Sequence, residues 1–561
     1  MAAELIDDPR LAALTAREAV RRMRRSLRLP VLPFLHRRSR ENDRLLAVPR
    51  DLERGKAAIA EAIYSGVFDL AGHRIVATAR SPFLETEAPA AWREALVSFE
   101  WLRHLSEVED ALASENARAL LRDFLAPGLR RRLSPAQRPD VAATRLIALL
   151  SHAPLLLQNA DSAFRRRFLD TLAAETRALK RAAPETAEGL ARLKVRIALA
   201  FAALCLPGRC DARSASAHLS DELDRQIFPD GGHVSRNPQA IAALLKMLLP
   251  LRQIYSMRGL AVPRSLFGAI DRMLPALRFF LHGDGATTLF NGASLVPVPL
   301  VAALVRQDET LGEPVGHMRQ SGYQRLSRGT TTIVADTGLA PPTALSGESH
   351  AGTLAFEFSS GRQRFVVNCG APSAGHEVHR RLARATAAHS TLTLGDRSSA
   401  RFARSERLDR FLGSPVVAGP SRVPSACEEV AEGQLLTAAH DGYRLAFGLV
   451  HEREMLLWHD GMRIEGADRL HPAAGRARML GPAPEATLRF HLHPDVAAEQ
   501  AGRGIRLAAG EEVWWFFCDQ PATLDDSVFF ASAKGPRRTR QIVAVMQPGT
   551  AQANWRFERQ R

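Results

Sequence analysis

The sequence predicts an α+β protein with two domains: an N-terminal (α/α) toroid of helical hairpins followed by an antiparallel β-sandwich. The chain has 561 residues, of which 46% are hydrophobic, and this is more than one ordinary core accommodates. Apolar residues recur with a helical period up to about residue 306 and alternate with a strand period after about residue 309. We therefore predict the domains at residues 1–308 and 309–561.

The first half consists of amphipathic helical patterns separated by Pro, Gly, Asp or Asn. Within each pattern, apolar residues recur at i, i+3, i+4 and i+7. The clearest patterns cover residues 95–108, 141–158, 161–182, 187–206 and 237–257. Successive antiparallel helices with short loops are typical of a bundle or a toroid of helical hairpins.

The second half consists of short strand patterns with turn residues between them. These patterns cover residues 325–338, 353–370, 389–396, 443–468, 488–493 and 510–519. Helical crossovers do not separate them as they would in a parallel sheet, so we expect large antiparallel sheets packed as a sandwich.

The charge balance is strongly basic, with a formal net charge of +15. Almost all of the excess is arginine, whose guanidinium group binds carboxylate and sulfate in bidentate fashion. An acidic polysaccharide is therefore a candidate partner, and a general compositional bias toward arginine is an equal alternative. The glycine-rich stretch 282–294 lacks the Lys and Ser/Thr of a phosphate loop, so we expect neither nucleotide nor nucleic acid as a partner.

The sequence predicts no transmembrane segment and no disulfide framework. The apolar run 197–208 is too short to cross a bilayer, and Gly, Asn and Pro interrupt the run 285–305. Five cysteines without a CxxC pair do not form a disulfide scaffold. The N-terminus lacks the succession of charged, apolar and small-residue regions that forms a signal peptide. This favours a cytoplasmic location. We interpret the basic helix around Arg17–Arg28 as a solvated face, with an anionic membrane surface as the alternative.

The connection DGGHVSRNP at residues 230–238 is unusually rich in hydrogen-bonding side chains. Asn237 before Pro238 fits a helix N-cap with Pro at the first helical position. That reading explains neither His233 nor Arg236. Because His, Asn and backbone N–H groups at a helix N-terminus can bind an anionic group, we predict an anion site here.

Polar residues also mark several strand ends in the second half. Glu348 and His350 alternate in SGESHAGTLAFEF (346–358), so both lie on one strand face. Asn368 ends the strand FVVN, and His389 opens HSTLTLGD (389–396). A single polar strand end is usually a surface residue, but several together suggest a shared site.

These segments, in this order, resemble the heparinase II/III family of bacterial polysaccharide lyases over most of the chain. FEWLRHL (99–105) resembles the N-terminal helical region of the family, and IFPDGGHVSRNP (227–238) resembles its active-site segment. LRFFLHGDGATTLFNG (277–292) resembles the following loop, and the stretch from residue 346 to residue 396 resembles the C-terminal β-domain. The resemblance implies a toroid followed by a sandwich, β-elimination on a uronic-acid-containing polysaccharide, and a periplasmic or cell-envelope location.

The resemblance also implies residue roles. Lyases of this kind neutralise the substrate carboxylate with Asn or His, and His or Tyr side chains then transfer protons as base and acid. The expected catalytic residues are His233, Asn237, Tyr255 and His350, and the expected substrate-binding residues are Arg236, Glu348 and Arg258. Tyr255 is the first choice among the four tyrosines because it follows the neutralising segment on the same helix. Tyr323 is the alternative, and Tyr255 would otherwise be a core aromatic.

The β-domain departs from the family pattern HxHxD. His350 keeps the second His, but Glu348 and Gly352 replace the first His and the Asp. Family members with a structural zinc ion use positions like His350, Asn368 and His389, and two histidines with an amide make a poor zinc site. We therefore expect no required cofactor, and at most a zinc ion held by His350 and His389.

Three functions are compatible with these residues. The first is a polysaccharide lyase acting on a heparin-like or bacterial acidic glycan. The second is a non-catalytic glycan-binding or envelope-assembly protein, which the altered HxHxD segment favours. The third is a glycoside hydrolase using Glu348 and Asp284. A lyase leaves a double bond in its product, a hydrolase adds water, and a binding protein does neither.

Overall fold

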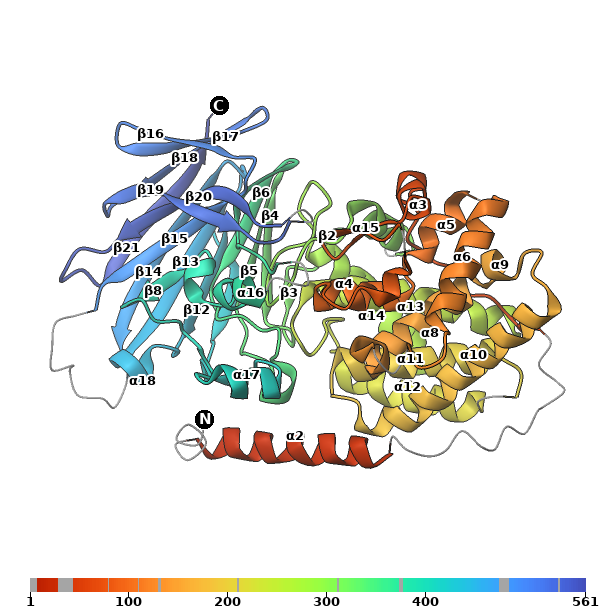
Figure 1. The fold of residues 1–561 in the computed structure, drawn as a ribbon. Helices are drawn as coiled ribbons and strands as arrows, with labels where there is room; N and C mark the ends of the chain where they lie inside the picture. The colour runs from red at the N-terminus through yellow and green to blue at the C-terminus, as the bar shows by residue number, and fades with distance from the viewer. Residues whose placement is uncertain are drawn as a thin grey trace. The chain divides into compact units, whose positions relative to one another are not determined.

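The computed structural model describes residues 8–28, 44–78, 80–108, 110–129, 133–208, 211–309, 312–372, 377–473, 484–532 and 535–560. It confirms the predicted class: a helical N-terminal region precedes an antiparallel β-sheet domain (Figure 1). The contacts divide the chain into two compact units. The β-unit comprises residues 1–15, 228–242 and 272–561, and the helical unit comprises residues 16–227 and 243–271. This division differs from the boundary predicted at 308/309, because residues 228–242 and 272–308 pack with the β-sheets.

The helical unit is built from antiparallel helices that bury their apolar stripes against one another. Helix α8 (Pro139–Ser151) packs against α10 (Ser162–Ala182) and α11 (Leu190–Cys205), and α11 packs against α12 (Ala212–Gln226). Asp161 caps α10 by accepting a hydrogen bond from the N–H of Phe164 at 2.7 Å, as expected for an Asp N-cap. The smaller elements are α3 (Ala57–Tyr64), α4 (Ala90–Ser98), α5 (Leu102–Val108), α6 (Ala111–Phe124), α9 (Ala153–Leu157) and the hairpin β1 (Val67–Leu70) and β2 (His73–Val76).

Three further helices connect to the sheets in sequence: α13 (Pro238–Met257), α14 (Arg264–Phe279) and α15 (Val298–Val305). Among the described residues, α13 alone is long and apolar enough to cross a membrane by length and composition. However, 61% of its most apolar window is buried inside the protein. This burial is typical of a core helix.

Two large antiparallel sheets make up most of the described strands of the β-unit (Figure 1), and β9 (Arg401–Phe402) and β10 (Val416–Ala418) form a small separate pair. The eight-stranded sheet has the order β11 (Ser425–Glu429), β12 (Gly433–His440), β13 (Leu449–Trp458), β14 (Arg463–Pro472), β21 (Gln552–Arg559), β18 (Glu512–Cys518), β17 (Gly504–Ala509) and β16 (Ala497–Ala501). The nine-stranded sheet has the order β19 (Ala522–Phe529), β20 (Arg537–Val545), β15 (Ala486–Leu492), β7 (Gln363–Val367), β6 (Phe356–Ser360), β5 (Thr331–Asp336), β4 (Tyr323–Arg328) and β3 (His317–Met318), and β8 (Leu392–Leu394) also pairs with β15.

The sandwich core is aromatic and contains one buried charged network. Alternate residues of β13 are buried, as expected for a strand with one face on a core. Phe356 stacks on Trp555 with ring centroids 5.6 Å apart. Beside them, Arg453 donates to Asp468 at 2.8 Å and also to the backbone carbonyls of Leu354 and Ser390. The guanidinium thereby fixes two backbone segments that lead into the candidate site.

Candidate functional site

The loop at residues 228–238 joins α12 to α13, and close approach explains its two glycines. Gly231 has φ of 82°, and a Cβ atom there would lie 2.0 Å from the carbonyl oxygen of Arg272. A Cβ atom on Gly232 would lie 1.9 Å from the Ser321 hydroxyl. Asp230 holds this close contact, since its carboxylate accepts from the N–H and the hydroxyl of Ser321, both at 2.7 Å. The glycines therefore serve packing, not catalysis.

His233 and Asn237 are connected through Ser235. The Nδ1 atom of His233 lies 2.7 Å from the Ser235 hydroxyl and accepts from the Ser235 N–H at 3.2 Å. The Ser235 hydroxyl accepts from the N–H of Asn237 at 3.3 Å. His233 is buried, and burial lowers the pKa of its imidazole to about 4, so the ring is neutral near pH 7. A neutral ring supplies no positive charge to an anion.

Asn237 acts as the predicted N-cap and keeps its amide nitrogen for another contact. Its Oδ1 accepts from the N–H of Gln239 at 2.9 Å, at the start of α13. Its Nδ2 donates to Oε2 of Glu348 at 3.1 Å. Glu348 itself is exposed, and a Cβ atom on Gly292 would lie 2.5 Å from the Glu348 carbonyl oxygen. The structure therefore brings together two predicted site residues, Asn237 and Glu348, that are distant in sequence.

The Arg236 side chain is buried in the fold. Its guanidinium donates to the carbonyl oxygens of Ser321, Leu339 and Gly322 and forms an ion pair with Asp336. Four of its five N–H groups are used in these contacts. The guanidinium also lies over the Tyr323 ring, 4.7 Å from the centroid. Arg236 thus holds its own loop, including a left-handed φ of 58°, against the strands of the β-unit.

Two residues of this network, Asn291 and Asp336, were missed in the sequence. The amide nitrogen of Asn291 donates to the Tyr323 hydroxyl at 2.7 Å and to Asp336 at 2.9 Å. Its Oδ1 accepts from the N–H of His350 at 3.3 Å. The dipeptide Asn291–Gly292 is the one available signal, since Asn-Gly favours positive φ, and Asn291 has φ of 47°. Asn291 and Asp336 position the backbone that carries His350.

His350 and His389 lie in contact, but neither belongs to a strand: His350 precedes β6 and His389 precedes β8, so the expectation that Glu348 and His350 lie on one strand face is wrong. Nδ1 of His350 lies 3.1 Å from Nε2 of His389, and Nδ1 of His389 lies 2.8 Å from the carbonyl oxygen of Ala385. Because a carbonyl only accepts, His389 carries its proton on Nδ1 and accepts from His350 through Nε2. Burial lowers the pKa of both rings, to about 4 for His389. Neutral His350 therefore has its lone pair on Nε2, where it can act as a weak base.

The donor set at this pair does not fit a zinc ion. The two ring nitrogens that face each other already share a hydrogen bond, and Oδ1 of Asn368 accepts from the N–H of Ser390 at 3.1 Å. The Asn368 amide nitrogen donates to the buried carboxylate of Glu357 at 3.0 Å. Within the described ranges, no group of three or more His, Cys, Asp or Glu side chains has metal-binding geometry. Hydrogen bonds among the side chains occupy the positions where the family resemblance implies a metal.

The packing around Gly352 explains why this position does not carry the aspartate of the HxHxD pattern. A Cβ atom there would lie 2.5 Å from Cδ2 of His389, so the imidazole ring occupies the space of a side chain. We expect Gly352→Asp to lower the free energy of unfolding by about 1–3 kcal/mol through overpacking, without creating zinc affinity. Gly316→Asp is the matched control, because Gly316 is exposed and a Cβ atom there would lie 3.4 Å from the nearest atom, the Arg325 carbonyl oxygen. Urea melts with and without zinc test this, and a zinc-dependent gain in stability would contradict it.

Tyr255 belongs to the helical unit and makes a local contact there. It lies near the end of α13, most of the helix length away from the capping residue Asn237. Its hydroxyl lies 2.5 Å from the Ser216 hydroxyl, and burial raises the pKa of the phenol. Arg258 follows the helix and is exposed. The contacts of Tyr255 are those of a core aromatic residue.

The two tyrosines of the β-unit are fully buried. The Tyr323 hydroxyl donates to the carbonyl oxygen of Arg236 at 2.6 Å, and the Tyr443 hydroxyl donates to that of Leu392 at 2.8 Å. Burial raises the pKa of both phenols. Each hydroxyl serves the fold as a hydrogen-bond donor.

A pocket of about 440 Å³ opens beside the Arg236 side chain. Arg236, Ser321 and Gly338 line it, together with the exposed residues His317 and Arg319. Apolar residues such as Phe228, Val234 and Leu339 make up the rest of the lining, and the pocket is large enough for a sugar unit or a short peptide segment. Arg319 is the exposed arginine of this lining, since the Arg236 guanidinium is paired with Asp336.

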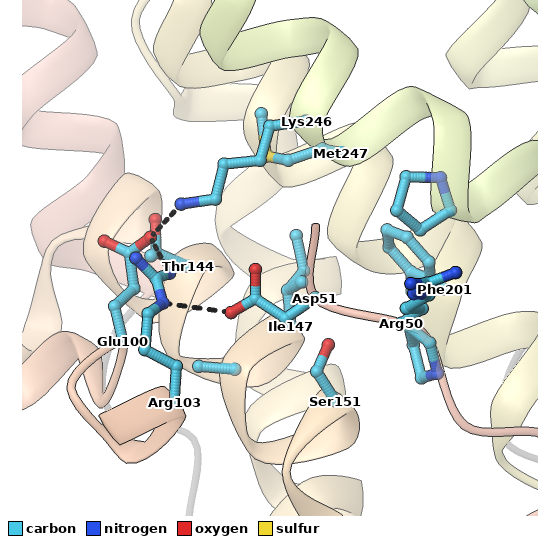
Figure 2. A pocket seen from close by; sticks show the side chains of 13 residues that line it. Arg50, Asp51, Glu100, Arg103, Thr144, Ile147, Ser151, Phe201, Lys246 and Met247 are labelled. Carbon is cyan, nitrogen blue, oxygen red and sulfur yellow. Dashed lines mark hydrogen bonds and ion pairs between the residues drawn. The ribbon is translucent and has the colours of Figure 1, made fainter. Parts of the chain in front are cut away.

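A smaller charged pocket lies in the helical unit (Figure 2). Arg103 contacts Asp51 at 3.0 Å, and Glu100 contacts Arg103 at 3.3 Å and Lys246 at 3.2 Å. Burial alone would raise the pKa of Glu100, but Lys246 and Arg103 lower it to about 2. With a volume of about 50 Å³, the pocket holds water at most. These paired charges form a structural network of the toroid helices.

Comparison with solved structures identifies the fold. A crystal structure of heparinase III matches with a TM-score of 0.68 at 13% sequence identity, over 98% of this chain and 89% of that chain. A mutant heparan sulfate lyase HepC from Pedobacter heparinus matches with a TM-score of 0.58 at 15% identity, over 98% of this chain and 88% of that chain. At such low identity the likeness shows the fold alone, an (α/α) toroid with a β-sandwich.

Sequence comparison finds a similar protein and a matching domain profile. FtsZ-localized protein C from Caulobacter vibrioides (strain NA1000 / CB15N) is 32% identical over 320 residues, which are 55% of this chain and 54% of that protein. The chain thus spans about half the length of the curated relative it matches. The profile named Heparinase II/III-like, C-terminal matches residues 310–556. Residues 310–556 are thus a heparinase II/III-like C-terminal domain, and the fold of the chain is that of the heparinase III structures.

Proposed function

We propose that this protein is a non-catalytic member of its family and that it acts by assembly with a protein partner at the cell envelope. The observation that carries the proposal is the Glu348 carboxylate, which accepts the hydrogen bond of the Asn237 amide at 3.1 Å. The relative named FtsZ-localized protein C suggests the partner, namely FtsZ or an assembly that contains it.

The electrostatics at Asn237 disfavour an anionic substrate. β-Elimination from a uronate needs a hydrogen-bond donor at the substrate carboxylate. Here the donor faces a carboxylate of the protein itself, and a bound uronate would bring a second negative charge beside Glu348. Two like charges about 4 Å apart near a protein surface repel by roughly 1–4 kcal/mol. The geometry therefore weakens the interaction on which the reaction depends.

The proton-transfer groups are also incomplete in the β-unit. His350 is neutral and offers a lone pair, but its lowered pKa makes it a weak base. In the described part of this unit, both tyrosine hydroxyls are buried and donate to backbone carbonyls, so neither faces a leaving glycosidic oxygen. These features support binding and assembly over turnover.

A test of the partner uses the full chain and purified FtsZ. We expect the protein to co-sediment with FtsZ polymers formed with GTP, and we expect no ultraviolet absorbance from unsaturated uronate when it is incubated with heparan sulfate, chondroitin or alginate. Absence of co-sedimentation would refute the proposal that FtsZ is the partner. New ultraviolet absorbance would refute the non-catalytic assignment, whatever the FtsZ result.

Lyase activity on a uronic-acid-containing polysaccharide is the second candidate, because the Asn237 amide and the neutral His350–His389 pair supply a donor and a base. If elimination occurs, Asn237→Ser should lower kcat about a hundredfold. Serine retains the cap acceptor for the Gln239 N–H, so the thermal melt should barely change. Asn554→Ser, which removes an exposed amide, is the matched control.

Glu348→Gln tests the electrostatic argument directly. Glutamine keeps an acceptor for the Asn237 amide and removes the negative charge, so we expect affinity for heparan sulfate to rise about tenfold, at an unchanged melting temperature. Glu511→Gln makes the same charge change at another exposed position and should leave the affinity unaltered. Equal effects of both variants would mean that overall charge, not the contact to Asn237, governs binding.

A further inference from the structure

Strand β11 forms an open edge of the eight-stranded sheet. Among the described strands it pairs with β12 alone, so its other side is the border of the sheet. Four of its five residues are exposed: Ala426, Cys427, Glu428 and Glu429. An edge strand presents a row of unpaired N–H and C=O groups, which is a template for one more strand.

The ladder with β12 shows which main-chain groups of β11 point outward. The carbonyl oxygen of Pro424 accepts an N–H of β12 at 3.0 Å, and Val430 exchanges two hydrogen bonds with the first residue of β12, at 2.8 and 3.2 Å. Hydrogen-bonded and non-hydrogen-bonded pairs alternate along an antiparallel ladder. The even-numbered residues therefore face β12, and the N–H and C=O groups of Ser425, Cys427 and Glu429 point away from the sheet.

β11 lacks the features that usually protect the edge of a sheet. Edge strands are commonly blocked by proline, lysine, a β-bulge or a very short length. Residues 425–429 contain neither proline nor lysine, and the ladder with β12 has no register shift. The edge strand β3 of the other sheet, in contrast, has only two residues. Glu429 is paired with Arg328 of β4, so little charge opposes the approach of another strand.

The segment around β11 is complementary to itself in charge. Residues 422–432, RVPSACEEVAE, begin with Arg422 and end with Glu432, and both side chains are exposed. Antiparallel pairing of two such segments places the basic end of each beside the acidic end of the other. Pairing about Cys427 also keeps the two Glu428 side chains out of directly opposite positions. Opposite charges across a sheet stabilise such a pairing, and like charges directly opposite weaken it.

We propose that β11 pairs in antiparallel fashion with β11 of a second copy of this chain. The two-fold axis passes between the two Cys427 residues, and Ser425 of each copy lies opposite Glu429 of the other. Each such pair exchanges two main-chain hydrogen bonds, so the pairing satisfies the groups that point outward. The eight-stranded sheets of the two copies then form one continuous sheet. This inference depends neither on FtsZ as a partner nor on the absence of catalysis.

Sedimentation velocity of the full chain at increasing concentration tests the proposal. We expect a monomer–dimer equilibrium for the wild type. Cys427→Pro removes the two central hydrogen bonds and places its ring in the path of the second strand, so the Kd of the dimer should rise about a hundredfold. Because the N–H of Cys427 points outward, the thermal melt should barely change. Cys427→Ser keeps this N–H, is the matched control and should dimerise like the wild type.

Charge reversal tests the register without a proline. Glu432→Arg places like charges together at both ends of the paired strands, so the Kd of the dimer should rise about tenfold. Arg422→Glu/Glu432→Arg reverses both charges and should restore the wild-type Kd. Glu511→Arg makes the same charge change at another exposed position of the β-unit and should leave the Kd unaltered.

Three results would overturn the proposal. It fails if the wild type is a monomer at every concentration, or if Cys427→Pro dimerises as tightly as Cys427→Ser. It also fails if Arg422→Glu/Glu432→Arg dimerises no more tightly than Glu432→Arg. If the wild type alone stays monomeric and FtsZ polymers retain it but not Cys427→Pro, the edge accepts a strand of that protein and not a second copy.

Discussion

Replacing Arg236 with methionine is expected to lower the free energy of unfolding by about 3–5 kcal/mol, the largest single-residue effect predicted here. The substitution removes the counter-charge of Asp336, whose side chain is only 3% exposed, and leaves that carboxylate buried without its ion pair. It also removes the hydrogen bonds that the guanidinium donates to the carbonyl oxygens of Ser321, Leu339 and Gly322. Urea melts followed by tryptophan fluorescence measure the loss.

Two further variants make this prediction specific. Arg319→Met removes an exposed arginine of the same unit and should change the stability by less than about 0.5 kcal/mol. Arg236→Met/Asp336→Leu removes both charges and should recover part of the loss, because no uncompensated charge stays buried. If Arg236→Met is as stable as Arg319→Met, then Arg236 does not anchor the loop, and a substrate role for it regains weight.

Acidification is expected to unfold the β-unit between about pH 6 and pH 5. Burial lowers the pKa of His233 and His389 to about 4 and that of His491 to about 3, against about 6.5 in an unfolded chain. Below pH 6.5 the unfolded chain therefore binds more protons than the folded one, and stability falls as pH falls. At pH 5 each of these histidines lowers the free energy of unfolding by about 2 kcal/mol. The three losses together approach the total stability of a domain.

The measurement is the midpoint of urea unfolding as a function of pH. Between pH 7.5 and 8.5, where these rings are neutral in both states, the midpoint should be constant. It should then fall steadily below pH 6.5. A midpoint that is unchanged at pH 5 would show that the buried rings are protonated in the folded protein, and that the tautomer assigned to His350 and His389 is wrong.

The two-domain architecture, the helix and strand patterns and part of the candidate site followed from the sequence alone. Periodicity is a local property, so the patterns at residues 161–182 and 187–206 correspond to α10 and α11 in the structure. The N-cap at Asn237 was also readable, because Asn before Pro is a local signal. The contact between His350 and His389 was not readable in this way, because both residues lie in loops that only the fold brings together.

Only the tertiary structure decided what each polar side chain contacts. Arg236 pairs with Asp336 across 100 residues of sequence, and no local pattern distinguishes such a buried arginine from one that faces a substrate. Periodicity reports only the local backbone conformation, so the sequence was enough to predict the fold class. Burial and pairing of charged side chains depend on long-range packing, so only the structure assigned their roles.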